Sequence, residues 1–400
     1  MYDNSSMYSS ENRFAWVEIN LENLSSNFEL IRDYILSFKK INDLKPKIMA
    51  VVKANAYGHG LIEISRKAVL SGASWLGVAL VHEGLVLRED GIKAPILCLG
   101  SHAPEKIKDA VENDITLSVT SLESAKLISD FCIGADMEAK VHIKIDTGMN
   151  RIGINYQNAI QNILLIKKLP KLIIDGVFTH FACASEKEES YTLMQWSRFS
   201  EIIRELKAMD IDIRNYHCAN SAAFARYPQM HLDMVRLGII TYGMNPFNDD
   251  FVEFCSKDSS GFIQKLKPVL SLKAKISFIK GIPAGESISY RGTFKTKKES
   301  IIATIPLGYA DGYSRHFSNK AYMIFNECFA PVVGTVTMDQ TMIDITHCRD
   351  AQNAKIGDEV VLIGKSNSLN LTAGTLAGLI GTINYEIVCM IGDRIPRLYV

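Results

Sequence analysis

Between residues 47 and 242, short runs of β-branched and other apolar residues alternate with longer stretches whose apolar residues have helical spacing. This alternation is typical of a parallel sheet whose strands are joined by crossover helices. The pattern predicts eight strands, at 47–52, 75–80, 95–99, 115–119, 140–145, 173–179, 215–218 and 234–237. It also predicts helices at 21–40, 61–70, 104–112, 122–132, 159–168 and 190–209.

Eight strands with crossover helices fit a closed (β/α)8 barrel, although a doubly wound open sheet fits the same pattern. The barrel is favoured by the polar residues that stand at or just past the carboxyl ends of predicted strands, namely Lys53, Arg151, His180, Asn220 and Arg236. Barrel active sites are built at these strand ends. We therefore predict an α/β protein with a (β/α)8 barrel over residues 20–255.

The pattern changes after about residue 248. From residue 267 onward the apolar runs are short and rich in β-branched residues, Gly and Pro mark turns, and only 372–381 looks helical. This predicts a second, mostly antiparallel β domain over 256–400, reached through the polar stretch 249–261. An early strand at 14–19 precedes the first helix, so we assign residues 1–19 to the β domain as well.

Composition excludes several classes of protein. The 44 basic and 44 acidic residues cancel, so the chain lacks the positive charge of a nucleic-acid or membrane-surface binder. No run of about 18 apolar residues predicts a membrane helix, and the polar start does not resemble a secretory signal. The eight cysteines are scattered singly, with no Cys/His cluster at zinc spacing. We expect a folded cytoplasmic protein with no metal site.

One lysine stands out on chemical grounds. Residues 50–60 read AVVKANAYGHG, so an apolar strand ends in Lys53 and a loop of small residues follows. A lysine at the interior end of a barrel strand is poorly solvated, which lowers its pKa and suits it to act as a Schiff-base nucleophile. Position alone favours an ordinary surface lysine after a strand.

Residues 50–60 resemble the pyridoxal-phosphate lysine motif of the alanine racemase family. Further matches follow in order at 146–153, 220–221, 235–239, 308–312 and 383–386, so the resemblance spans about residues 16–399. It implies a (β/α)8 barrel followed by a β domain, with pyridoxal 5'-phosphate as the cofactor. It also implies the interconversion of L-alanine and D-alanine, which supplies D-alanine for peptidoglycan.

The resemblance implies two catalytic bases, Lys53 and Tyr290. Racemisation removes the α-proton from one face of the substrate and returns it to the other, so one base on each face suffices. Tyrosine is a weak base that needs support, and in the family this comes through a histidine and an arginine that match His180 and Arg236. The same arginine faces the cofactor's pyridine nitrogen and weakens the ring as an electron sink.

The remaining roles also come from the resemblance. Cofactor binding, mainly of the phosphate, is implied for Tyr57, Asn220, Ser221, Gly238, Ile239 and Tyr385. Arg151 and Met338 would bind the substrate carboxylate, and Tyr309 and Tyr385 would narrow the entrance. Lys144 matches a lysine that is carbamylated in some members, where it orients the arginine equivalent to Arg151.

Around Met338 the sequence departs from the family. Many members have Cys-Met-Asp here, whereas this chain has Thr337 before Met338 and Asp339. Asp339 can still order the loop, but inhibition that depends on the cysteine is not expected.

In the family, β-domain residues reach the lysine of the partner subunit. A homodimer with shared active sites is therefore implied, with alanine as the small-molecule partner. Three alternatives remain. A racemase of broader specificity would also turn over serine, a D-threonine-type aldolase would need a divalent metal, and a non-enzymatic pyridoxal-phosphate homeostasis protein would consist of the barrel alone.

Overall fold

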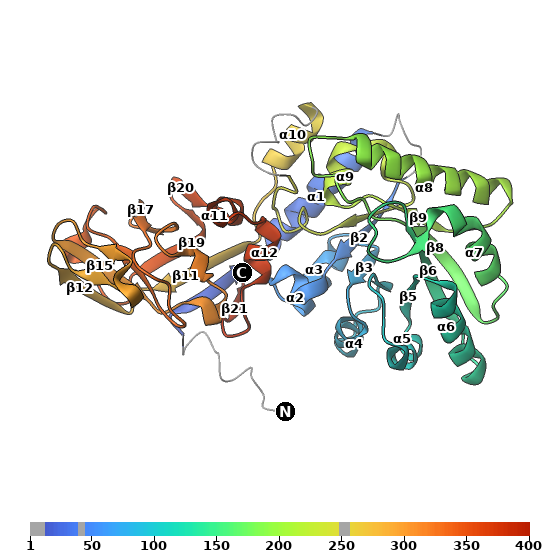
Figure 1. Cartoon of the computed structure of the whole chain (residues 1–400), viewed down its shortest axis with the longest axis horizontal. Helices are drawn as coiled ribbons and strands as arrows, with labels where there is room; N and C mark the ends of the chain where they lie inside the picture. Colours follow the sequence, from blue (N-terminus) through green and yellow to red (C-terminus); the bar gives the residue numbers. More distant parts are fainter. Residues whose placement is uncertain (1–12, 39–44, 248–256) are drawn as a thin grey trace. The chain divides into compact units, whose positions relative to one another are not determined.

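The computed structural model describes residues 13–38, 45–247 and 257–400 (Figure 1). The chain divides into two compact units. The first in sequence, which we call the barrel unit, comprises 24–56 and 60–267, and the β unit comprises 13–23, Tyr57–His59 and Pro268–Val400. Residues 1–12, the predicted helix end at 39–40, Cys255 and the greater part of the predicted linker lie outside the described residues.

Eight parallel strands form the sheet of the barrel unit, in the order β10-β2-β3-β4-β5-β6-β8-β9. Their bounds are β2 Lys47–Val51, β3 Trp75–Val78, β4 Ile96–Cys98, β5 Ile115–Val119, β6 Ala139–Asp146, β8 Leu172–Phe178, β9 Asn215–His217 and β10 Met234–Leu237, with the short β7 Ile154–Asn155 beside β6. Between β9 and β10, the Asp233 amide donates to the Tyr216 carbonyl at 3.2 Å. The sheet is thus a nearly closed barrel, and the doubly wound alternative is wrong.

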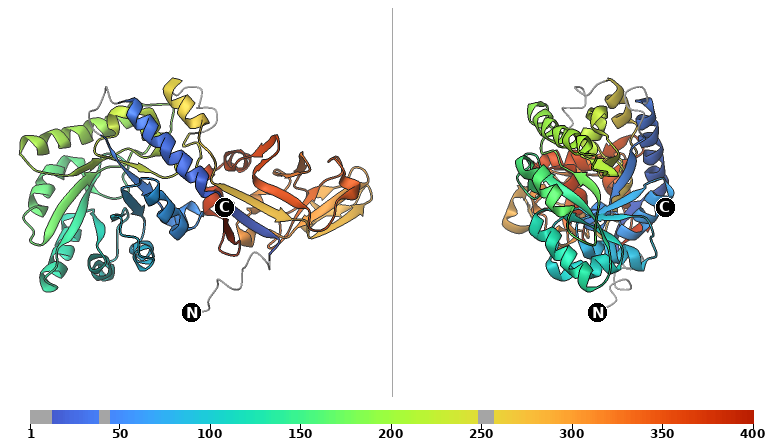
Figure 2. Two further views of the ribbon diagram at one scale, coloured as in Figure 1. Left: turned by 180° about the vertical axis from the view of Figure 1, so that it is seen from behind. Right: turned by 90° about the vertical axis from the view of Figure 1, so that its right-hand side faces the viewer.

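Helices lie on the outside of these strands (Figures 1 and 2). They are α1 Leu21–Ser37, α3 Leu61–Leu70, α4 Val81–Glu89, α5 Ile107–Glu112, α6 Leu122–Gly134, α7 Ala159–Ile166, α8 Ser190–Ala208, α9 Ser221–Arg226 and α10 Lys257–Gln264. The predicted helices are present, but α4, α9 and α10 were missed, and α10 overlaps the end of the predicted polar linker. In α4 the apolar residues are not confined to one face, and α9 is too short to show a period. No helix among residues 13–38, 45–247 and 257–400 is long and apolar enough to cross a membrane.

Large side chains fill the interior of the barrel. Met49, Trp75, Leu97 and Met234 form a buried cluster from neighbouring strands. Gly176 is required for close packing, because a Cβ atom there would lie 2.6 Å from the His142 ring. The absent side chain leaves room for a histidine inside the barrel, so the core is packed yet partly polar.

The β unit is mostly antiparallel, as predicted. Its largest sheet has the order β17-β16-β19-β11-β1-β21, with β20 on β19, and contains β1 Ala15–Ile19, β11 Leu270–Lys275, β16 Tyr322–Phe325, β17 Cys328–Pro331, β19 Glu359–Ser366, β20 Leu369–Leu371 and β21 Arg397–Tyr399. The smaller sheets contain β12 Phe278–Ile282, β15 Ser300–Ile305 and β18 Thr341–Asp344, and β13 Ser287–Ile288 with β14 Phe294–Lys295.

The early strand β1 pairs within this unit, which confirms its predicted partnership with the β domain. It runs antiparallel to β11 and parallel to β21, and Figure 1 shows it in blue among the orange and red strands. Helix α11 Ala373–Ile380 matches the helix predicted there. A second helix, α12 Asn384–Cys389, was missed because six residues with a β-branched centre give no helical period.

Candidate active site

Lys53 follows β2 at the start of an unusual turn. Ala54, Asn55, Ala56 and Tyr57 all have φ between +52° and +55°, which is the left-handed region. The turn is closed where the Ala56 amide donates to the Val52 carbonyl at 2.8 Å. Non-glycine residues rarely adopt this conformation, and consecutive ones hardly ever do. Strain of this kind gathers at functional sites, which marks the half-buried Lys53 as more than a surface lysine.

Glu83 on α4 holds this turn, and sequence reasoning missed it. Its Oε1 accepts a hydrogen bond from the Ala54 amide at 2.6 Å, and its Oε2 accepts from the amides of Ala79 and Leu80 at 2.8 and 3.1 Å. One carboxylate thus ties the residue after Lys53 to the amino-terminal end of the helix. The only sequence signal was a glutamate three residues into an unrecognised helix.

Arg236 on β10 lies at the centre of a buried polar network in the barrel. Its guanidinium donates to His217 Nδ1 at 3.0 Å, to His180 Nδ1 at 3.1 Å and to the Thr179 carbonyl at 2.8 Å. Burial lowers the pKa of Arg236 to about 10, so it remains a cation at neutral pH. The predicted contact between His180 and Arg236 is therefore present in the structure.

The network continues through two further histidines. His217 Nε2 lies 2.8 Å from His142 Nδ1, and His142 Nε2 lies 3.5 Å from Asp175 Oδ2. Because arginine can only donate, His217 must accept at Nδ1 and carry its proton on Nε2. His142 then accepts from His217 at Nδ1 and carries its own proton on Nε2. His180 also accepts from Arg236 at Nδ1, which leaves a proton on its Nε2.

Lys144 on β6 is buried in the same region, 4% exposed, with its Nζ 4.8 Å from the centre of the Phe178 ring. Burial and the charges of Arg236 and Arg151 lower the pKa of Lys144 well below its ordinary value. Burial and four nearby basic side chains, namely Arg236, Lys144, Arg151 and Lys53, lower the pKa of His180 well below its ordinary value. These side chains therefore gather in one place at the carboxyl ends of the strands.

The turn that follows β6 carries Arg151. Asp146 Oδ1 accepts from the amides of Gly148 and Asn150 at 2.9 and 3.1 Å, and Asn150 has a left-handed φ of 54°. Gly153 is needed here, because a Cβ atom would lie 3.0 Å from the Lys144 carbonyl oxygen. The turn thus brings the exposed Arg151 back toward Lys144, and no protein acceptor among the described residues takes its guanidinium N–H groups.

Small polar groups gather where α9 and the segment after β10 meet. Asn220 caps α9, and its Oδ1 accepts from the Ala223 amide at 2.9 Å. The buried Ser221 Oγ accepts from the Gly238 amide at 3.1 Å, and Ile239 follows directly. The structure therefore brings Asn220, Ser221, Gly238 and Ile239 together, as expected for one binding surface.

Tyr57 and Tyr385 belong to the β unit and lie together, with ring centres 6.0 Å apart. Burial is the main cause that raises the pKa of both hydroxyls, so both are neutral donors at any physiological pH. The carbonyl of Val388 would lie 2.3 Å from a Cβ atom at Gly58, which also has φ of +78°. Glycine after Tyr57 thus permits the close approach of α12.

Tyr290 lies at a strained turn of the β unit. Ser289 and Arg291, on either side of it, both have φ of 65°, and the Thr335 hydroxyl donates to the Tyr290 carbonyl at 3.1 Å. The side chain is 70% exposed. The backbone of Tyr290 is therefore held by a hydrogen bond, while its side chain is exposed to solvent.

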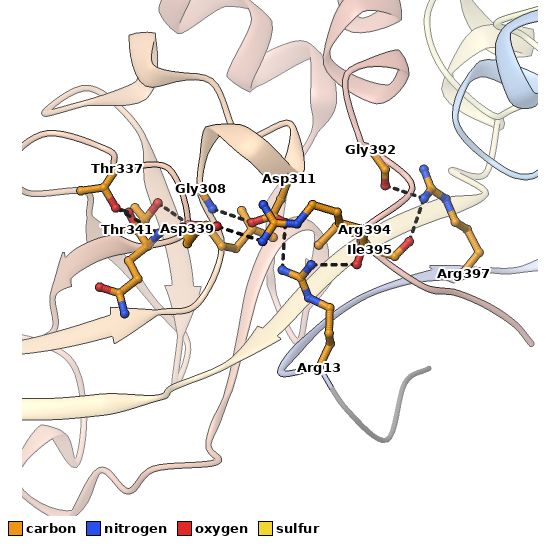
Figure 3. A network of polar contacts seen from close by, with 12 residues as sticks. Arg13, Gly308, Asp311, Thr337, Asp339, Thr341, Gly392, Arg394, Ile395 and Arg397 are labelled. Carbon is orange, nitrogen blue, oxygen red and sulfur yellow. Dashed lines mark hydrogen bonds and ion pairs between the residues drawn. The ribbon is translucent and has the colours of Figure 1, made fainter. Parts of the chain in front are cut away.

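The segment around Asp339 is held by a charged network (Figure 3). Arg394 donates to Asp339 Oδ1 at 2.9 Å and lies 3.5 Å from the buried Asp311, which also accepts from Arg13 at 2.8 Å. Asp339 is therefore paired with Arg394, and its role in ordering the loop stays a prediction.

The exposed residues Tyr309 and Met338 are joined to this segment by backbone bonds. The Tyr309 amide donates to the Thr337 carbonyl at 3.0 Å. Thr337 uses its hydroxyl within the loop, accepting from the Gln340 amide at 3.1 Å and donating to the Gln340 carbonyl at 3.0 Å. The threonine at the usual cysteine position thus closes a turn that a thiol would close less firmly.

The candidate residues fall into two sets, one in each unit. The barrel unit brings together Lys53, Lys144, Arg151, His180, Asn220, Ser221, Arg236, Gly238 and Ile239. The β unit carries Tyr57, Tyr290, Tyr309, Met338, Asp339 and Tyr385. Sequence reasoning missed Glu83, His142, His217, Asp175 and Asp311, whose roles depend on partners distant in the chain.

Known proteins resemble this chain over nearly its whole length. An alanine racemase from Clostridium tetani (strain Massachusetts / E88) is 43% identical over 390 residues, which cover 97% of this chain and 96% of the relative. One from Methanococcus maripaludis is 41% identical, covering 96% of this chain and 98% of the relative.

Solved structures agree with these sequences. A Clostridium difficile 630 alanine racemase has a TM-score of 0.88 at 38% identity, covering 97% of this chain and 96% of the other. A Bacillus anthracis alanine racemase with bound L-Ala-P has a TM-score of 0.87 at 38% identity, covering 97% and 95%. Residues 19–246 match the family model "Alanine racemase, N-terminal domain" and 269–399 match "Alanine racemase, C-terminal domain". This chain belongs to the alanine racemase family.

Proposed function

We propose that this protein is an alanine racemase, which interconverts L-alanine and D-alanine by a two-base mechanism with pyridoxal 5'-phosphate as its cofactor. The observation that carries the proposal is the group of cations around His180, which lies next to the strained turn of Lys53. A family match to both domains supports it. D-Alanine is the product that peptidoglycan synthesis would use.

The residues of the barrel unit fit this cofactor. An anionic group is favoured where Lys53, Arg151 and Arg236 gather. The Ser221 Oγ accepts from the Gly238 amide and can donate its own O–H to a phosphate, and the neutral hydroxyls of Tyr57 and Tyr385 are suited to the same task. Asn220 caps the helix that begins at Ser221, and Ile239 would add a further amide donor. Bound in this way, the cofactor would withdraw electrons from the substrate's α-carbon and so acidify its proton.

Two residues would move that proton. Lys53 Nζ would hold the cofactor until substrate arrives and then act as the base on one face, while Tyr290 Oη would act on the other. His180 carries its proton on Nε2, because Arg236 donates to Nδ1. A donor at that nitrogen is suited to stabilise a tyrosine in its ionised form, which is the form that accepts a proton.

Arg236 would limit side reactions. Its guanidinium stays protonated and is held by two histidines and a carbonyl, so it can donate to an unprotonated ring nitrogen but cannot transfer a proton to it. This restrains the cofactor's capacity to withdraw electrons. Prompt return of the proton to the α-carbon is then favoured over transamination.

We propose that Arg151 and the Met338 amide bind the substrate carboxylate, and that Lys144 is carbamylated. The lowered pKa of Lys144 favours the neutral amine, which is the nucleophilic form that adds to carbon dioxide with the loss of one proton. The resulting anion would lie among cations and could accept the N–H groups of Arg151. Intact-mass measurement of the native protein should show the added carbon dioxide, and should not show it in Lys144→Met.

We further propose a homodimer with shared active sites. Tyr290 is 70% exposed although its backbone is fixed, and Tyr309 and Met338 are exposed as well. Such residues suit a site completed by a second copy. Mixing inactive Lys53→Ala and Tyr290→Phe subunits should restore activity, because one site of a mixed dimer would contain both native bases. No recovery after subunit exchange, checked by mass, would contradict shared sites.

The decisive experiment is a chiral assay of the purified protein with L-alanine, after pyridoxal phosphate has been added. Formation of D-alanine that Lys53→Ala abolishes is expected. L-Serine should react more slowly, because Tyr309 and Tyr385 would narrow the site around a methyl group, although an added hydroxyl is rejected only weakly, by roughly a factor of 100. A higher rate with serine would favour the broader racemase, and an inactive protein would overturn the proposal.

A further inference from the structure

Three metal-binding side chains converge in the β unit, apart from every residue assigned to the candidate active site. Cys328, His347 and Cys348 each offer one sulfur or nitrogen atom, and these atoms lie within 4.8 Å of one another. Cys328 begins β17, and His347 and Cys348 lie in the turn after β18. An isolated bridge between Val332 and Ile343 holds these two segments side by side.

The backbone around the cluster is well anchored. The Cys348 amide donates to the Ile345 carbonyl at 2.9 Å, and Asp344 Oδ1 accepts from the Thr346 amide at 2.9 Å. The Thr346 hydroxyl in turn accepts from the Ile301 amide on β15 at 2.8 Å. The turn that carries two of the three side chains is therefore fixed to the sheet, which limits the entropy lost when a ligand binds.

His347 already has the arrangement of a metal ligand. Its Nε2 lies 3.3 Å from the carbonyl oxygen of Phe329 on β17, and this leaves Nδ1 for a metal. Histidines that bind metals almost always donate their other ring N–H to a carbonyl or carboxylate, because this fixes the ring and raises the basicity of the ligating nitrogen.

We propose that Cys328, His347 and Cys348 form a site for one zinc-type divalent cation, with water as the fourth ligand. Two thiolates and one imidazole suit a borderline-soft ion that prefers tetrahedral geometry. Zinc–sulfur bonds of about 2.3 Å place two tetrahedral sulfurs about 3.8 Å apart, so the side chains need to move by at most about 1 Å. Binding releases two protons, one from each thiol.

The state of the thiols without metal supports this chemistry. Cys328 and Cys348 are both free, as are the other described cysteines. A divalent cation deprotonates a thiol that it binds, so metal affinity should fall as the pH is lowered.

This site could not be predicted from the sequence, because the spacing of its ligands is not one that is typical of zinc sites. Cys328 stands far upstream of the adjacent pair His347 and Cys348, and only the pairing of β16 with β17 and the bridge to β18 bring it near. The bound ion would link two segments of the β unit, β17 and the turn after β18. We therefore assign it a structural role that is independent of racemisation.

Cobalt(II) binding to the reduced holoenzyme tests the proposal. Thiolate ligands give cobalt an intense charge-transfer band, which should saturate at one ion per chain and disappear when zinc is added. Cys328→Ser should lose the band, and His347→Ala should weaken binding at least about tenfold. Cys183→Ser, which changes another half-buried cysteine in the barrel unit, should bind as the wild type does. Difference spectra against Cys328→Ser remove any contribution of metal bound to the cofactor phosphate.

Two outcomes would overturn the proposal. Equal cobalt spectra from the wild type and Cys328→Ser would show that the cluster does not bind metal. The other outcome is a reduced protein that binds no cobalt and then loses two free thiols on air oxidation. This would show that Cys328 and Cys348 serve as a disulfide pair. Because His347 is exposed, its replacement tests the site even if Cys348→Ser, at a buried position, fails to fold.

Discussion

Replacing Glu83 with glutamine should loosen the turn that holds Lys53. The carboxylate uses both oxygens, accepting from the Ala54 amide on one side and from the amides of Ala79 and Leu80 on the other. Glutamine has a single acceptor oxygen. We expect that oxygen to keep the pair of amides at the start of α4, because two bonds outweigh one. The side-chain NH2 group then faces the Ala54 amide, and two donors meet.

The structure allows the cost to be worked out. A hydrogen bond to a charged acceptor contributes about 1.5–3 kcal/mol, and the half-buried position of Glu83 favours a value of about 2 kcal/mol. Four left-handed residues, each costing at least about 1 kcal/mol, give the turn a strain of about 4 kcal/mol. The lost bond therefore offsets about half of this strain. A loss of 2 kcal/mol shifts the equilibrium between the ordered and relaxed turn by about 30-fold.

Three measurements check this expectation. Glu83→Gln should lower the free energy of unfolding by about 2 kcal/mol, release cofactor faster on dialysis, and reduce kcat/KM for L-alanine by up to about 30-fold. Glu89→Gln is the matched control, since it makes the same change at an exposed position of the same helix. If Glu83→Gln matched the control in stability and in cofactor retention, the carboxylate would not be what holds the turn.

Three further predictions concern buried titratable groups. In CO2-free buffer, the unfolding free energy of the wild type should rise relative to that of Lys144→Met as the pH increases toward the ordinary pKa of lysine. The reason is that, over this pH range, the unfolded chain binds a proton that the folded amine does not. Parallel curves of unfolding free energy against pH would contradict this. Burial lowers the pKa of His231 to about 4, so this residue should reduce the unfolding free energy by about 3 kcal/mol as the pH falls from 6.5 through that value. In denaturant titrations, His231→Phe should lack that part of the loss. An equal loss of unfolding free energy in the variant would contradict the prediction. His217→Leu should leave a buried N–H of Arg236 unpaired, which lowers the unfolding free energy by about 1–3 kcal/mol and lowers kcat. His217→Gln should recover most of the stability and of kcat, because its amide oxygen can accept that N–H. Equal losses in the two variants would refute the contact.

The barrel could be predicted because its evidence is local. Each strand is a short apolar run, and reactive residues such as Lys53 and Arg236 follow or end such runs. Burial of a parallel sheet on both faces produces this pattern directly. The pairing of β1 with the β unit could also be predicted, since β1 stands before the first helix of the barrel pattern.

Other features of the candidate site depend on long-range contacts and left no local signal. Nothing in an alanine predicts a left-handed φ, so the turn after Lys53 could not be foreseen. Glu83 acts on backbone amides, which have no sequence identity of their own. His142 and His217 meet across the barrel only because Gly176 leaves space, and such a contact needs the closed sheet to be known first.

The position of β1 has a consequence for the order in which this protein can be completed during its synthesis. β1 leaves the ribosome before most of the barrel unit, whereas its neighbours β11 and β21 are made after it. All of the barrel unit, residues 24–56 and 60–267, is translated in between. The barrel can therefore form while β1 still has open edges, and those edges are exposed to unwanted pairing until β11 and β21 follow. Removal of β21 should thus disturb β1, although the two strands are far apart in sequence.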